Sequence, residues 1–133
     1  TGKVRFEYRH YIVVDGNVGG SESRRAAEAS ECANAQGRFW DYHAMLFANQ
    51  HGEGQGAFAD RRLKAFAQAL GLDAGEFDAC FDAGRYAGNV KADEALARSL
   101  GVSATPTLFV NGLKVDSSLT ALQSAIEAGL AQP

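Results

Sequence analysis

Helical periodicity covers most of the chain between residues 24 and 101, and a glycine or a glycine-rich loop follows each segment that shows it. Glycine after an apolar helical stripe is a typical C-terminal cap, because it adopts the left-handed conformation without steric cost. Each segment therefore predicts one short helix, and together they predict a helical block at residues 20–100. The segments are residues 24–36, 39–47, 61–70, 73–84 and 89–100.

The starts of two helices carry their own signals. Residues 61–70 place four apolar side chains on one helical face, and Asp60 precedes them as a predicted N-cap. Asp73 and Glu76 resemble a capping box at the start of the next helix. In the segment at residues 39–47, the periodicity predicts a shared apolar face formed by Phe39 or Trp40, His43, Leu46 and Phe47.

The helical block has strand signals on both sides. Residues 3–14 alternate apolar and charged side chains, which predicts a strand, and the turn-rich residues 15–23 follow. After the block, residues 107–110 and 113–115 predict two strands joined by an Asn-Gly turn, and Ser117 or Ser118 caps a last helix. The expected order is strand, helices, two strands and helix, which is an α/β architecture.

Composition argues against nucleic acid as a partner and against a membrane-spanning helix. The 133 residues, 46% hydrophobic and 22% charged, fit one domain with a buried core. A net charge of -3 with no basic stripe argues against nucleic acid as a partner. No apolar run approaches the roughly 18 residues that a membrane helix needs.

Residues 101–112, GVSATPTLFVNG, contain the only proline before the terminal Pro133. Proline cannot donate to a sheet ladder, so it usually stands at an edge or at the first residue of a strand. Taken alone, Pro106 would simply begin a strand, with the trans peptide bond that most prolines have.

The wider pattern resembles a known family. A glycine-capped helix, a Thr-Pro-Thr loop, an apolar strand, Asn-Gly and a second strand resemble the thioredoxin superfamily. Residues 22–50 (ESRRAAEASECANAQGRFWDYHAMLFANQ) and 77–84 (FDACFDAG) resemble the helical insertion of DsbA-like disulfide oxidoreductases. The resemblance extends over essentially the whole chain.

This resemblance implies a thioredoxin-like fold in a single domain spanning residues 1–133. A strand at residues 1–15 would be followed by a helical insertion at 20–100 and a ββα unit at 105–133. The Thr105–Pro106 peptide bond would be cis, and Ala104, Thr105 and Pro106 would bind an extended substrate chain.

Members of this family carry a Cys-x-x-Cys pair in the first turn of a helix, where the helix dipole lowers the pKa of the attacking thiol. This chain has only Cys32 and Cys80, which cannot form such a pair. The resemblance therefore implies that the redox dithiol lies outside this chain, that the domain is N-terminally incomplete, and that the chain alone is inactive. It also implies a gap in the sheet, which strand exchange or a dimer would fill.

Three interpretations of Cys32 and Cys80 remain open: a structural disulfide, two buried thiols, or a catalytic pair. The resemblance favours the disulfide, because some DsbA-like proteins have an accessory bridge in this insertion. It further implies cysteine-containing protein or peptide substrates, a redox partner protein, no cofactor, and a location outside the cytoplasm.

Other classes of function have weaker signals. Glycine-rich residues 15–23 between a strand and a helix suggest phosphate binding. His43 and His51, with His10 or Asp41, suggest a metal site, although no metal is our prediction. A non-catalytic binding domain, or a glutathione-using relative of the same fold, needs no Cys-x-x-Cys. The aromatic residues Phe39, Trp40, Tyr42 and Phe47 suggest a groove, but such stripes more often belong to the core.

Overall fold

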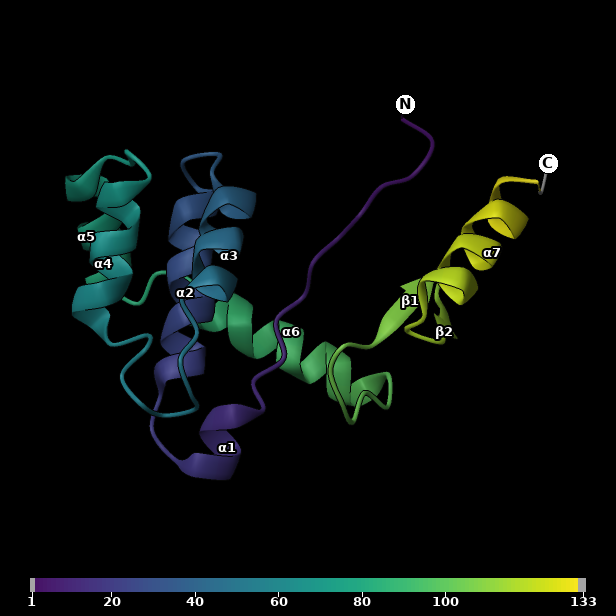
Figure 1. The fold of residues 1–133 in the computed structure, drawn as a ribbon, viewed down its shortest axis with the longest axis horizontal. Coiled ribbons are helices and arrows are strands. Elements are labelled where there is room, and N and C mark those ends of the chain that lie inside the picture. The colour runs from purple at the N-terminus through teal and green to yellow at the C-terminus, as the bar shows by residue number, and fades with distance from the viewer. Residues whose placement is uncertain (1, 132–133) are drawn as a thin grey trace. The chain divides into compact units, whose positions relative to one another are not determined.

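The computed structural model describes residues 2–131 and divides them into two compact units. The helical unit comprises residues 10–96, and the hairpin unit comprises residues 2–9 and 97–131. Seven helices and a two-stranded sheet make up the described residues (Figure 1). The helices are α1 (Val14–Val18), α2 (Glu22–Asn34), α3 (Phe39–Ala48), α4 (Asp60–Ala69), α5 (Ala74–Asp82), α6 (Ala87–Ser99) and α7 (Leu119–Leu130), and the strands are β1 (Leu108–Val110) and β2 (Leu113–Val115).

Helix α2 is the centre of the helical unit and contacts α1, α3, α4 and α5. Ala29 and Ala33 on α2 are completely buried, and their small side chains let the neighbouring helices approach closely. Larger side chains from α3, α4 and α5 fill the remaining core. The largest of these, all fully buried, are Tyr42, Leu63, Phe77 and Phe81.

The predicted glycine caps are confirmed. Gly71 has φ 71° and Gly101 has φ 70°, so both take the left-handed conformation that ends a helix. After Gly71, the N–H of Leu72 donates to the carbonyl of Ala67 at 3.0 Å, which closes the end of α4. The sequence predicted these helix ends well because a cap is a local feature.

The two predicted N-caps had different outcomes. The carboxylate of Asp73 accepts a hydrogen bond from the N–H of Glu76 at 2.8 Å, so this cap of α5 is confirmed. The prediction for Asp60 was wrong, because Ala59 is the N-cap of α4 and Asp60 lies in its first turn. The carboxylate of Asp60 instead binds the guanidinium of Arg25 on α2.

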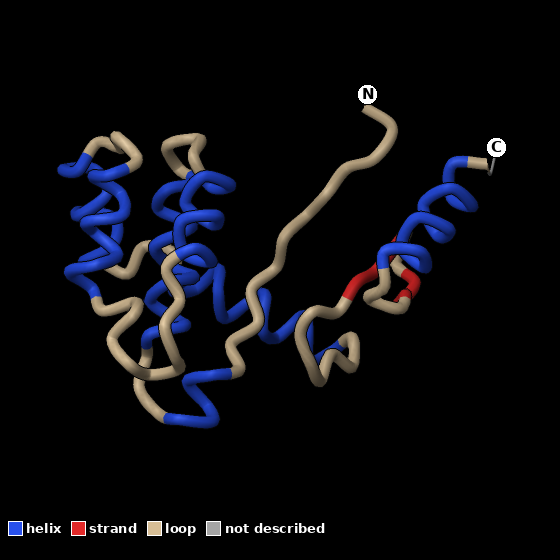
Figure 2. Tube along the Cα trace, viewed as in Figure 1, coloured by secondary structure: helices blue, strands red, loops and turns tan. Residues whose placement is uncertain are grey.

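The strand predicted at residues 3–14 is absent. Residues 4–13 contain no strand, and residues from Val14 onward form α1 where a turn was expected (Figure 2). In the part of the chain that the structure describes, the sheet consists of β1 and β2 alone. A β-strand is defined by main-chain hydrogen bonds to a partner strand, and an alternating side-chain pattern does not show that such a partner exists.

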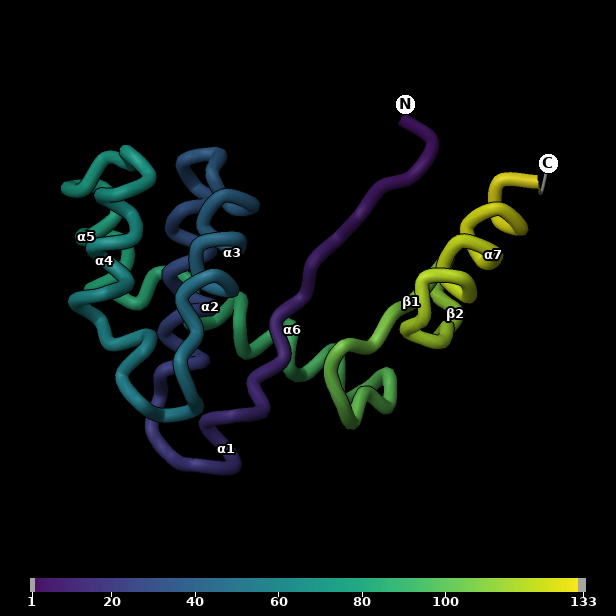
Figure 3. The backbone as a smooth tube through the Cα atoms, viewed as in Figure 1, coloured from purple at the N-terminus to yellow at the C-terminus, as the bar shows by residue number. Residues whose placement is uncertain are grey.

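In the hairpin unit, β1 and β2 pair antiparallel with Val110 opposite Leu113. Asn111 with φ 49° and Gly112 with φ 81° form the two-residue turn between them, as the sequence predicted. Helix α7 packs on both strands (Figure 3). The hydroxyl of Ser118 accepts a hydrogen bond from the N–H of Ala121 at 3.3 Å. The predicted ββα unit is therefore present. That both units belong to one domain stays a prediction.

Candidate functional site

The predicted binding residues lie in a loop of the hairpin unit, between α6 and β1. The N–H of Val102 donates to the carbonyl of Ala97 at 2.9 Å, which fixes the start of the loop at the end of α6. Ala104, Thr105 and Pro106 are exposed. The peptide bond between Thr105 and Pro106 is cis.

One side-chain hydrogen bond crosses this loop. The hydroxyl of Thr107 donates to the carbonyl of Ala104 at 2.6 Å, and so it spans the Thr105–Pro106 bond. Within residues 2–131, the main-chain N–H groups of Ala104 and Thr105 donate to no acceptor. The loop thus combines one internal hydrogen bond, which we call the Thr107 latch, with exposed residues whose N–H groups have no acceptor among the described residues. Such a loop is suited to pairing with another extended chain.

Strand β1 begins directly after the loop and presents an open edge. Its only partner among the described residues is β2, on one side. A peptide that followed the loop would therefore meet unpaired main-chain groups along β1 as well. The sheet gap predicted from the resemblance concerns this edge, and what fills it stays a prediction.

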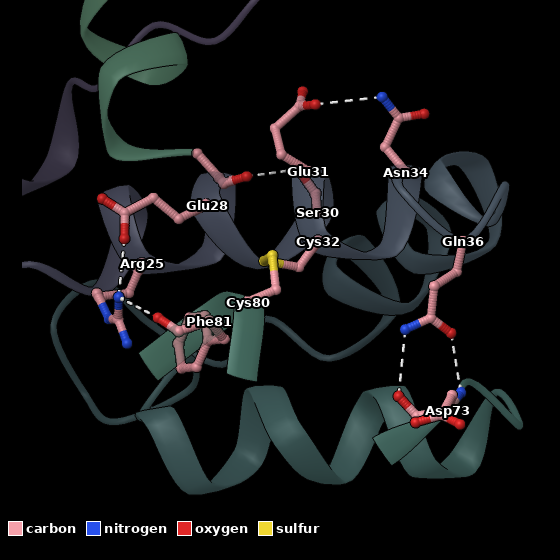
Figure 4. Close-up of a disulfide and its surroundings, with 11 residues drawn as sticks. Arg25, Glu28, Ser30, Glu31, Cys32, Asn34, Gln36, Asp73, Cys80 and Phe81 are labelled. Atoms are coloured by element: carbon pink, nitrogen blue, oxygen red, sulfur yellow. Dashed lines mark hydrogen bonds and ion pairs between the residues drawn. A yellow bond between two sulfur atoms is a disulfide. The ribbon is translucent and has the colours of Figure 1, made fainter. Parts of the chain in front are cut away.

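Cys32 on α2 and Cys80 on α5 form a disulfide with a Cα separation of 5.9 Å (Figure 4). Each cysteine is only 2% exposed, and the described residues contain no free cysteine. The attacking species in thiol-disulfide exchange is an accessible thiolate. This buried bridge does not have the exposure of a catalytic pair.

Polar contacts stand on both sides of the bridge (Figure 4). Toward one end of α2, the guanidinium of Arg25 donates to the carbonyl of Phe81 at 3.3 Å. Toward the other end, the side chain of Gln36 donates to the carbonyl of Asp73 at 3.1 Å and accepts from its N–H at 2.8 Å. Sequence reasoning did not predict these contacts, because each of them joins positions far apart in the chain.

The phosphate-binding interpretation of residues 15–23 is not supported. The carboxylate of Asp15 accepts hydrogen bonds from the N–H groups of Ser23 and Arg24, both at 2.9 Å. These are N-terminal donors of α2, where a bound anion would sit. A side chain of the same protein already occupies the position and contributes negative charge there.

The histidines do not assemble the metal site considered above. Among residues 2–131, no three His, Cys, Asp or Glu side chains come close enough to hold a metal ion. The Nε2 atom of His10 lies 2.9 Å from a carboxylate oxygen of Glu31. His43 is partly buried in a cluster of rings, and its pKa is lowered by burial and by the neighbouring His10.

The aromatic residues of α3 divide between two environments. Tyr42 is completely buried, and its hydroxyl donates to the carbonyl of Leu63 at 2.8 Å. Trp40 is 50% exposed and Phe47 is 60% exposed. The stripe predicted from periodicity is therefore the core face of α3 only in part: Leu46 packs against the core, whereas the buried aromatic residue is Tyr42, which lies outside the stripe.

Comparisons with known proteins show which family this chain matches and which proteins are similar to it in sequence. A model of the family described as thioredoxin matches residues 1–128. Na(+)/H(+) antiporter NhaA 3 of Salinispora tropica is 33% identical over 130 residues, which are 96% of this chain and 19% of that protein. Na(+)/H(+) antiporter NhaA of Herminiimonas arsenicoxydans is 38% identical over 96 residues, which are 72% of this chain and 15% of that protein.

The chain thus spans less than a fifth of the length of these two curated relatives. No solved structure matches it. Among the described residues, no helix is both long and apolar enough to cross a lipid bilayer.

Proposed function

Because this chain belongs to the thioredoxin family, we propose that it forms part of a thiol-disulfide oxidoreductase whose redox dithiol lies outside residues 1–133. The match over residues 1–128 supports a DsbA-like domain of the thioredoxin superfamily. The observation that carries the proposal is the state of the cysteines, since Cys32 and Cys80 are bonded to each other and 2% exposed. The chain has no other sulfur that could act as nucleophile.

The reaction would be thiol-disulfide exchange. A thiolate of the external dithiol attacks one sulfur of a substrate disulfide, which forms a mixed disulfide and releases the other substrate sulfur as a thiolate. The second thiol of the dithiol then attacks the mixed disulfide as its thiolate, releases the substrate and closes the dithiol into a disulfide. Two electrons pass to the substrate, and the reverse sequence oxidises a substrate dithiol.

Residues 104–106 would bind the substrate chain in this scheme. These residues are exposed, and the hydrogen bond from Thr107 to Ala104 restricts the loop before a peptide arrives. Restricting a binding loop in advance reduces the conformational entropy lost on binding. An extended peptide would then pair with the main chain of the loop, as in strand addition.

The substrates in this proposal are proteins or peptides with cysteines, and a redox partner protein would restore the dithiol. A disulfide in the helical unit favours an oxidising compartment outside the cytoplasm. The fine architecture is also proposed to be DsbA-like, with residues 20–100 as the insertion. Strand exchange or a second copy would cover the open edge of β1.

A second candidate is a non-catalytic binding domain of the same fold. Relatives with antiporter names favour it, because in those proteins the matched region is a small part of a chain with a different named activity. A glutathione-using relative of the same fold is a third candidate. In both cases the loop would bind a partner without an external protein dithiol.

The experiment that tests the binding loop is photo-crosslinking. A benzoylphenylalanine at position 104 should capture an extended cysteine-containing peptide, and the same probe at exposed position 120 on α7 should not. Equal capture at both positions would contradict a binding role for residues 104–106. Capture by a loop that never supports thiol exchange, even in the protein from the complete reading frame, would favour the non-catalytic alternative.

A further inference from the structure

We propose that the Cys32–Cys80 pair is a reversible redox couple whose reduction leaves α5 docked on α2. The proposal does not depend on the catalytic role discussed above. It rests on the contacts that bracket the disulfide at the interface of these two helices, which we call the Arg25 contact and the Gln36 contact (Figure 4).

The Arg25 contact joins three helices. The guanidinium of Arg25 on α2 donates to the carbonyl of Phe81 on α5 at 3.3 Å, and its central carbon lies 3.7 Å from the centre of the Phe81 ring. It also binds both carboxylate oxygens of Asp60 on α4, at 3.2 Å and 3.1 Å. Glu28 accepts a further hydrogen bond at 2.8 Å. None of these interactions requires the sulfur–sulfur bond.

The Gln36 contact holds the other end of α5. Gln36, just beyond α2, exchanges two hydrogen bonds with the main chain of Asp73, at 3.1 Å and 2.8 Å. The carboxylate of Asp73 also caps α5 through the N–H of Glu76. The same residue therefore fixes the start of α5 and its position beside α2.

The core gives α5 a third support. Phe77 and Phe81 are completely buried, and α5 contacts α4 as well as α2. The centres of the Phe77 and Tyr42 rings are 5.6 Å apart, which links α5 to α3. Burial of two phenylalanines holds a helix in place without a covalent bond.

Docked helices would keep the two thiols close together after reduction. Because each cysteine is only 2% exposed, exchange with a dithiol reductant takes place during brief local openings of α5, after which the helix docks again. Two electrons and two protons pass to Cys32 and Cys80, and the reductant becomes a disulfide. The Cα separation of 5.9 Å lies in the range that a disulfide requires. A disulfide oxidant such as oxidised glutathione forms a mixed disulfide with one of these thiols and releases one glutathione as a thiol. The second thiol then displaces the other glutathione, so the same bond re-forms within one molecule, favoured by the high effective concentration of the two thiols.

The bridge would then change the stability of the helical unit but not its shape. Loop closure predicts that reduction lowers the midpoint temperature by about 10–15 °C. A protein of this kind would stay folded, and able to re-form its disulfide, when the redox potential of its surroundings changes.

The test compares oxidised and dithiothreitol-reduced protein by amide hydrogen exchange, with thiol titration to confirm reduction. We expect the amides of α5 to stay protected in the reduced protein and to exchange no faster than about 1,000-fold above the oxidised rate, which is the change that loop closure predicts. After removal of the reductant, oxidised glutathione should restore the Cys32–Cys80 bridge at a rate independent of protein concentration. Loss of all protection in α5, or formation of disulfide-linked oligomers, would overturn the proposal.

Variants separate the bracketing contacts from the core. In the reduced state, the amides of α5 should exchange at least about tenfold faster in the double variant Arg25→Met, Gln36→Ala than in the wild type, whereas the control Lys64→Met should exchange like the wild type. Lys64 also contacts α5, through Asp82 at 2.8 Å, but on the exposed surface. A reduced double variant whose α5 amides exchange like those of the wild type would overturn the role of the two contacts.

The variant Cys32→Ser, Cys80→Ser, with both contacts intact, gives an independent result even when the double variant does not fold. The proposal predicts a folded serine variant with α5 protected. An unfolded serine variant would overturn it.

Discussion

The hydroxyl of Tyr42 offers a quantitative test of how the helical unit is held together. Tyr42 is completely buried, and its hydroxyl donates to the carbonyl of Leu63 on α4 at 2.8 Å. The substitution Tyr42→Phe keeps the ring, whose centre lies 5.6 Å from that of Phe77, and removes the hydrogen bond alone. It therefore isolates one polar contact between α3 and α4.

The expected cost follows from what remains. A neutral hydrogen bond contributes about 0.5–1.5 kcal/mol net, and an unsatisfied buried group costs more. The carbonyl of Leu63 lies within α4, where the helical pattern also provides the N–H of Ala67 as a donor. In the variant, the carbonyl of Leu63 therefore loses one of two donors and stays hydrogen-bonded. We expect Tyr42→Phe to lower the free energy of unfolding by about 1 kcal/mol, or the midpoint temperature by about 3–5 °C.

The same residue predicts a dependence on pH. Burial raises the pKa of Tyr42 above its ordinary value of 10.0, so the folded protein keeps this proton where the unfolded chain loses it. The stabilisation is fully present below the unfolded pKa and is lost as pH rises above it toward the folded pKa. At pH 10.5 the loss from this one group is about 0.8 kcal/mol.

The assay is urea unfolding of both proteins at pH 8 and pH 10.5. The wild type should exceed Tyr42→Phe by about 1 kcal/mol at pH 8 and by only about 0.2 kcal/mol at pH 10.5. Tyr86→Phe is the matched control, because the hydroxyl of Tyr86 makes no hydrogen bond within the described residues, and it should change stability by less than about 0.5 kcal/mol. Equal stability of wild type and Tyr42→Phe at pH 8, or an advantage that does not shrink at pH 10.5, would refute this reasoning.

Three further predictions concern the hairpin unit. Thr107→Val should weaken binding of an extended cysteine peptide by about 3–10-fold in calorimetric titration, because the latch to Ala104 is lost, while Thr107→Ser should bind normally; undiminished binding by the valine variant would count against the latch. Gly112→Ala should cost about 1 kcal/mol in thermal unfolding, since φ 81° is strained for alanine, and an unchanged midpoint would contradict the assigned turn. Ser118→Ala should cost about 1 kcal/mol by loss of the α7 cap, measured in the same way, and Ser117→Ala should be neutral.

Local signals in the sequence predicted local structure well. The glycine ends of α4 and α6, the Asp73 cap and the Asn-Gly turn each depend on a few neighbouring residues, and each was found. The helical block could be predicted for the same reason. The resemblance to a family added the pairing of Cys32 with Cys80, which periodicity alone left open.

Contacts between distant segments could not be predicted in this way. Asp60 is a residue type that is preferred at N-caps, but Arg25 on another helix binds its carboxylate instead. The apolar stripe on α3 did not reveal that Tyr42 faces the core, because a helix with apolar residues all round has no unique buried face. Alternation in residues 3–14 predicted a strand, whereas a strand also needs a ladder partner that a short sequence pattern cannot identify.

Insulin reduction tests whether the catalytic sulfur comes from outside residues 1–133, as we propose. The assay compares the 133-residue chain, its Cys32→Ser, Cys80→Ser variant, and the protein encoded by the complete reading frame that contains these residues. We expect no turnover by the first two proteins, and turnover by the third that requires a Cys-x-x-Cys outside this chain. Turnover by the 133-residue chain that the serine variant lacks, or a complete protein without any thiol exchange, would contradict this proposal.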